Sequence, residues 1–124
     1  MFTYTGLPLR SGSWHNVNNR FRDSCGAFIL SEIRACLVPG DPEGAARYAF
    51  GDACVDHAGE GLYAEVFCAA VQSAAFVVQD TATLIGIGLS YIPENCGISR
   101  AGEPRTLRLT VVNGFLMQQW LRIR

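Results

Sequence analysis

The sequence predicts an all-α fold, and two observations carry this prediction. Apolar side chains recur three or four positions apart through much of residues 20–92, which is the spacing of one face of an α-helix. Prolines and helix-capping residues stand at the places where such helices would begin and end. With 124 residues and 49% hydrophobic side chains, the chain is long enough to bury one core. We therefore expect a single domain built around packed helices.

The first predicted helix covers residues 20–37. Before it, residues 1–19 are rich in Gly, Ser, Asn and Pro, so we expect an irregular segment there. The helix should end before Pro39-Gly40, which disfavours its continuation. Its proposed core-facing stripe consists of Phe21, Cys25, Phe28, Ile29, Ile33 and Cys36.

A second helix is expected over residues 42–56. Asp41 is a good N-cap acceptor, Pro42 suits the first helical position, and Glu43 lies beside the positive end of the helix dipole. After a glycine turn at 58–61, the apolar run 62–78 predicts a central, buried helix. Asp80 can cap a further helix that ends at about Ile92, because Pro93 follows.

The C-terminal part of the chain has a different character. Residues 106–112 alternate partly as a strand would, and Asn113-Gly114 is a signal for a two-residue hairpin turn. The sequence therefore favours a β-hairpin over 106–123. An amphipathic helix from Phe115 is the competing interpretation.

Composition argues against several classes of partner. A formal net charge of −1 supplies no basic field for nucleic-acid binding, and the longest apolar run contains Glu65, so a membrane span is not expected. Five cysteines without a C-x-x-C pair favour reduced thiols. Because residues 1–10 also lack the features of a secretory signal, we expect a cytoplasmic protein.

One dense polar cluster stands out around the end of the second predicted helix. Carboxylates four positions apart share a helical face, so Asp52 and Asp56 could contribute to a cation site, although a solvated face is the commoner outcome. The Gly59-x-Gly61 pattern fits either an anion-binding turn or a plain tight turn. Apolar surroundings predict unreactive thiols at Cys54 and Cys68. The cluster comprises Asp52, Asp56, His57, Glu60 and Glu65.

Three stretches resemble, in order and separation, the middle of ADP-ribosylglycohydrolase-family proteins. They are P-G-D-P-E-G-A-A-R-Y-A-F-G-D-A at 39–53, D-H-A-G-E-G-L-Y-A-E-V-F-C-A-A-V at 56–71, and G-L-S-Y-I-P-E-N at 88–95. A fainter likeness reaches S-E-I-R at 31–34, so that the resemblance covers about residues 20–96. Residues 97–124 depart from it and form a divergent tail. By this resemblance, residues 1–124 are a single partial domain.

The resemblance implies an all-helical hydrolase that cleaves the glycosidic bond between ADP-ribose and an acceptor, with Mg²⁺ ions in its cleft. The family's acidic metal motifs lie near the two ends of the full-length chain, and no D-D-T motif occurs here. We therefore expect neither the metal ligands nor the catalytic residues in this chain, which would be an inactive piece. The substrate-binding residues that carry over are His57, Gly59, Gly61 and Tyr63.

Three positions depart from the family pattern: Asp56 replaces a typical serine, Glu60 a typical asparagine and Ala64 a typical glycine. The added acids should repel a pyrophosphate by on the order of 1 kcal/mol per close pair. The alternative prediction is a non-enzymatic helical module that binds a partner. As a fragment, the chain should self-associate through apolar residues left partly covered. These are Leu62, Val66, Phe67, Val71 and Phe76.

Overall fold

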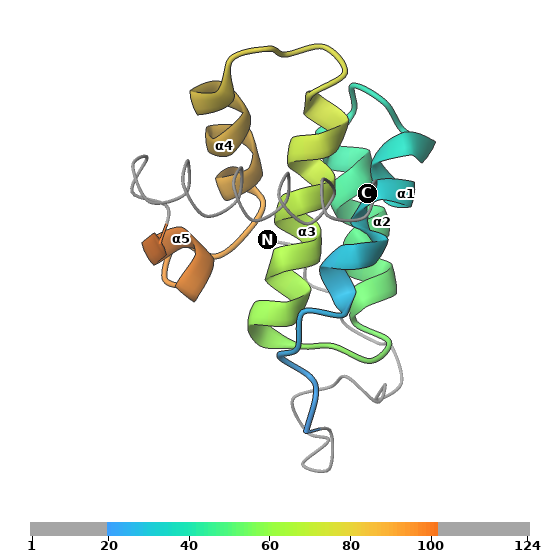
Figure 1. Cartoon of the computed structure of the whole chain (residues 1–124), viewed down its shortest axis with the longest axis vertical. Coiled ribbons are helices and arrows are strands. Elements are labelled where there is room, and N and C mark those ends of the chain that lie inside the picture. Colours follow the sequence, from blue (N-terminus) through green and yellow to red (C-terminus); the bar gives the residue numbers. More distant parts are fainter. Residues whose placement is uncertain (1–19, 102–124) are drawn as a thin grey trace, which may run out of the picture.

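The structure is a computed structural model and describes residues 20–101. The regular structure of this range is entirely helical and contains no strand, which confirms the all-α prediction for the described residues. In Figure 1 the long helix α3 runs through the middle, with α1 and α2 on one side and α4 and α5 on the other. Within residues 20–101, no helix is both long and apolar enough to cross a lipid bilayer.

Helices α2 (Pro42–Ala53) and α3 (Gly59–Ala74) form the centre of the core. Helix α2 begins as predicted, with the side chain of Asp41 accepting a hydrogen bond from the amide N–H of Gly44. Its inner face carries small side chains that are almost completely buried, and these allow α2 to approach α3 closely. The small residues on this face are Ala45, Ala46, Ala49 and Ala53.

The prediction of one helix over residues 20–37 is wrong. Residues 20–26 form turns, the short 3-10 helix η1 covers Ala27–Leu30, and α1 covers Ser31–Leu37. The amide N–H of Ala58 donates to the carbonyl oxygen of Arg22 at 2.9 Å. This contact holds the turns against the α2–α3 connection, so a tertiary interaction replaces the first turns of the predicted helix.

The face of η1 and α1 that packs inward is also not the predicted one. Small residues spaced by four, Ala27, Ser31 and Ala35, are buried against α3, because they permit close packing. The large apolar side chains lie mostly outside: Ile29 is 59% exposed and Ile33 is 57% exposed. The sequence pattern was amphipathic, but packing selected the stripe of small residues.

The remaining helices differ from prediction mainly at their ends. Helix α2 stops at Ala53 instead of residue 56, α3 begins and ends earlier than 62–78, and α4 covers Thr81–Ser90 instead of reaching Ile92. Asp80 caps α4 as expected, accepting from the amide N–H of Thr83. Helix α5 (Gly97–Ala101) lies in the predicted divergent tail. The predicted irregular segment 1–19 and hairpin 106–123 lie outside the described residues.

Helix α3 is better covered than the fragment hypothesis predicts. Leu62, Val66 and Phe67 are buried, with exposed fractions of 8%, 2% and 3%, so the prediction that they are only partly covered is wrong. Helix α4 supplies part of the cover, since Gly88 lets its backbone lie against Phe67 and Val71. Val71 is half-buried and Phe76 is 60% exposed, as predicted.

Candidate functional site

His57 lies in the connection between α2 and α3 and is held at both ring nitrogens. Its Nδ1 is 2.6 Å from Oδ1 of Asp56, and its Nε2 is 3.1 Å from Oγ of Ser24. An ionised carboxylate only accepts hydrogen bonds, so Nδ1 carries the proton of the neutral ring and Nε2 accepts from the Ser24 hydroxyl. The side chain of His57 is 10% exposed and that of Asp56 is 67% exposed. The imidazole is therefore an inward-lying group with a defined orientation.

The two glycines predicted to contact substrate are both buried. Gly59 has a φ of +57°, a conformation that favours glycine at the start of α3. A Cβ on Gly61 would lie 2.9 Å from the carbonyl oxygens of both Arg22 and Ser24. Gly61 thus permits a close approach of the protein's own backbone. In the structure the segment 22–24 covers the glycine turn, and the turn does not face open space.

The side chains of Glu60 and Tyr63 lie beside the start of α5. The carboxylate of Glu60 accepts from the amide N–H of Gly97 at 2.7 Å and from that of Ile98 at 3.4 Å. Burial raises the pKa of Tyr63, and the nearby charges of Cys96 and Glu60 raise it further. The half-buried Tyr63 is thus placed beside Glu60 and the loop before α5, whereas His57 is placed beside Ser24.

The polar cluster seen in the sequence divides among separate interactions. Asp52 pairs with Arg34 of α1, with 2.7 Å between Oδ2 and Nη2. No guanidinium N–H points at that oxygen, so the contact is an ion pair without a well-formed hydrogen bond. Because α2 ends at Ala53, Asp52 and Asp56 do not share a helical face. Among residues 20–101, no group of three or more His, Cys, Asp or Glu side chains is arranged to hold a metal ion.

Glu65 is the largest fully buried side chain of the described residues, with 0% exposure. Neither of its carboxyl oxygens has a hydrogen-bond partner, and Nε of Arg34 is likewise buried without one. Burial raises the pKa of Glu65 to about 8; the charge of Asp52 raises it and that of Arg34 opposes the rise. Glu65 is therefore mainly protonated at neutral pH, because the charged form loses its hydration.

Sequence reasoning missed two residues of these sites. Arg34 had only a weak signal, as a lone cation within an apolar helical stretch. Ser24 had no sequence signal, because its partner His57 lies 33 positions away.

The five cysteines are free. Burial raises the pKa of Cys68 to about 11, which keeps that thiol protonated and unreactive as predicted.

The arrangement around His57 places a carboxylate, an imidazole and a hydroxyl in one hydrogen-bonded chain at the edge of the helical core. Such a chain can move a proton, and it can also bind hydroxyl groups of a ligand at its exposed end.

Comparisons with protein-family models, with curated proteins and with solved structures gave no match to this chain.

Proposed function

We propose that this chain is the central helical part of an ADP-ribosylglycohydrolase-like hydrolase, with its substrate-facing edge at His57. The observation that carries the proposal is the ordered resemblance of residues 39–53, 56–71 and 88–95 to that family. In support, these stretches belong to α2, to the following turn with α3, and to the end of α4, which contribute to one core. They are therefore parts of one packed unit.

The contacts of His57 are compatible with binding of ADP-ribose through its ribose. Ser24 and Asp56 present a half-buried hydroxyl and an exposed carboxylate beside the imidazole, and such groups suit ribose hydroxyls. The phosphates have poorer partners, because the segment 22–24 covers Gly61 and the carboxylate of Asp56 lies nearby. We therefore expect weak binding through the ribose, with little contribution from the first turn of α3.

Magnesium ions, which the family would use, do not fit the acidic residues described here. Asp52 is paired with a cation, Glu60 accepts from backbone amides of α5, and Glu65 is buried with a raised pKa. A hard divalent cation prefers several ionised oxygens free to converge on it. No step of the proposed function is therefore assigned to Mg²⁺ on these residues, and the 124-residue chain alone is expected not to hydrolyse ADP-ribose conjugates.

The binding part of the proposal is tested by titrating the chain with ADP-ribose and following backbone amide shifts. We expect shifts at Ser24, Asp56 and His57, and their loss in His57→Gln. Glu60→Asn should tighten binding by reducing repulsion. Glu60→Gln is the matched variant that keeps the side-chain length needed to reach Gly97. Shifts confined to another surface, or unchanged affinity in both Glu60 variants, would contradict this placement of the pocket.

The inactivity of the isolated chain is tested separately. Pure protein should not release ADP-ribose from ADP-ribosylated arginine or serine when Mg²⁺ is added. Release that depends on Mg²⁺ and disappears with a chelator would show that a metal site exists in this chain.

The alternative function, a non-enzymatic interaction module, is favoured by one observation. Large apolar side chains on η1 and α1 lie outside the core, where they could contact a partner. They are Ile29, Leu30, Ile33 and Leu37, each more than half exposed.

A further inference from the structure

Asp56, His57 and Ser24 form a hydrogen-bonded chain that ends at the Ser24 hydroxyl. The glycoside hydrolysis proposed above does not require this chain. Asp56 Oδ1 lies 2.6 Å from His57 Nδ1, and His57 Nε2 lies 3.1 Å from Ser24 Oγ. The carboxylate fixes the tautomer that leaves Nε2 free to accept a proton. A carboxylate, an imidazole and a serine hydroxyl in this order are the groups that activate an alcohol for attack on an acyl carbon.

The site also leaves an approach to Ser24. The residue is half-buried, and Gly26, two positions further on, is exposed. A Cβ on Gly26 would lie only 3.3 Å from His57 Nε2, so the glycine lets the backbone of this segment lie close to the ring that Ser24 contacts. Access to the reacting groups is therefore from the side of the half-buried Ser24 hydroxyl.

We propose that Ser24 is the nucleophile of an acyl-transfer site, with His57 as its general base and Asp56 as the residue that positions the imidazole. The substrates are carboxylic esters with small acyl groups, because the hydroxyl lies near the surface beside an exposed glycine. This activity uses the same side chains as the ADP-ribose binding proposed above but does not require that binding.

The reaction balances without a further cofactor. Ser24 Oγ bonds to the carbonyl carbon while its proton passes to His57 Nε2. The tetrahedral adduct then breaks the bond between carbon and the leaving oxygen, and the leaving alcohol takes the proton from Nε2. Water repeats the sequence on the acyl-serine, which releases the carboxylic acid and restores the hydroxyl.

A structural role for the same contact must be separated from a chemical one. The hydrogen bond between Ser24 and His57 also ties residues 20–26 to the α2–α3 connection, together with the bond from Ala58 to Arg22. Removing the Ser24 hydroxyl therefore changes packing as well as chemistry. Asp56→Asn is the more selective variant, because most of the Asp56 side chain is exposed while its oxygen still orients the ring.

The test uses the whole 124-residue chain with 4-nitrophenyl acetate and with a fluorophosphonate probe. We expect a burst of nitrophenol and a probe adduct that peptide mass spectrometry places on Ser24. Ser24→Ala should abolish both signals. His57→Gln and Asp56→Asn should slow acylation roughly 100-fold or more, the usual effect of disabling a general base.

Two control variants exclude other nucleophiles. Cys25→Ser removes the exposed neighbouring thiol, and Ser90→Ala removes an exposed serine on α4; both should keep the burst. Thermal melting of each variant establishes that it is folded. The proposal is overturned if the adduct lies on another residue, if Ser24→Ala keeps the wild-type burst, or if folded Asp56→Asn acylates at the wild-type rate.

Discussion

Arg34 on α1 and Asp52 on α2 form an ion pair with 2.7 Å between Nη2 and Oδ2, and this pair interacts electrostatically with the buried carboxyl of Glu65 on α3. Three helices therefore meet around charged groups inside a small core. The side chains of the pair are 25% and 29% exposed, whereas Glu65 is not exposed at all. The pair keeps some hydration, so Glu65 is the residue whose ionisation is most costly.

The first prediction is that the free energy of unfolding falls as the pH rises from about 4.5 to about 8. The pKa of Glu65 is about 8 in the folded chain and 4.5 ordinarily, so the folded state holds this proton more tightly. Its stabilising contribution is complete below pH 4.5 and is lost as the pH rises through the folded value. At about 1.4 kcal/mol per pKa unit, the loss amounts to a few kcal/mol. Urea unfolding followed across this pH range measures it.

Glu65→Gln is the matched control, because it keeps the volume of the side chain and cannot ionise. The difference between the two stability curves isolates Glu65 from other groups that titrate in the same range. We expect the variant to be the more stable protein above pH 8. Parallel curves for the two proteins would show that Glu65 is not protonated in the folded state.

The second prediction compares two glycines of α4. A Cβ on Gly88 would lie 2.5 Å from Cγ2 of Val71 and 2.6 Å from Cε2 of Phe67, closer than side chains can approach. Gly88→Ala should therefore destabilise the fold by about 1–3 kcal/mol through overpacking. A Cβ on Gly86 would meet no atom within 4 Å, so Gly86→Ala should stabilise the helix by up to about 1 kcal/mol.

Thermal and urea unfolding of the two alanine variants would give opposite shifts. Equal effects of the same sign would mean that α4 does not pack on α3 through Gly88.

The third prediction concerns the contact between Glu60 and α5. Glu60→Ala removes the acceptor for the amide N–H groups of Gly97 and Ile98, and should cost about 1 kcal/mol, as the loss of a helix cap does. Hydrogen exchange should become faster in residues 97–101 while α2 keeps its protection. Glu94→Ala, at an exposed acid just before α5, is the control and should leave exchange there unchanged. If both variants behave alike, the Glu60 contact does not hold α5.

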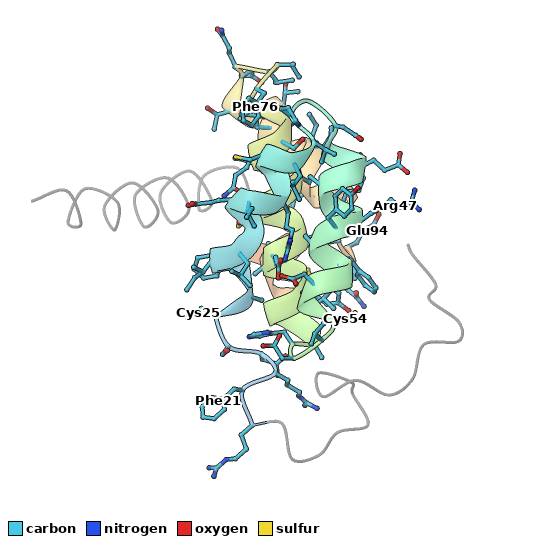
Figure 2. The ribbon with its side chains drawn as sticks, turned by 90° about the vertical axis from the view of Figure 1, so that its right-hand side faces the viewer. Phe21, Cys25, Arg47, Cys54, Phe76 and Glu94 are labelled. Carbon is cyan, nitrogen blue, oxygen red and sulfur yellow. The ribbon has the colours of Figure 1, made fainter. Side chains whose placement is uncertain are left out.

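The fourth prediction is self-association through the exposed face of η1 and α1. Ile29, Ile33 and Leu37 are spaced by four and are each more than half exposed, so they form one apolar stripe. The exposed side chains of Phe21 and Phe76 lie far from each other, at opposite ends of the molecule in Figure 2. We therefore expect association to depend on the stripe.

Light scattering over a concentration series tests this expectation. Ile33→Asp should shift the chain towards monomer, because a charge in the middle of the stripe opposes burial. Tyr48→Asp changes a similarly exposed residue of α2 and should not. A wild-type chain that stays monomeric at high concentration would contradict self-association through this stripe and weaken the fragment hypothesis.

The sequence alone determined those features that depend on neighbours within a few residues. Asp41 and Asp80 cap α2 and α4 as predicted, because each side chain bonds an amide three positions along the chain. The buried alanine face of α2 was also predictable from the sequence, since helical spacing places those residues on one side of the helix. The resemblance to ADP-ribosylglycohydrolases also rests on the sequence alone and remains a prediction.

Tertiary structure decided which groups meet and which faces are buried. Ser24 contacts His57 across 33 positions, and Glu60 contacts Gly97 across 37, so no local pattern encodes either pair. Another long-range contact interrupts the predicted helix over 20–37, because a hydrogen bond from the amide of Ala58 holds Arg22 in a turn. Close packing on α3 then favours the small residues of η1 and α1 over the large apolar ones, since short side chains let the two backbones approach.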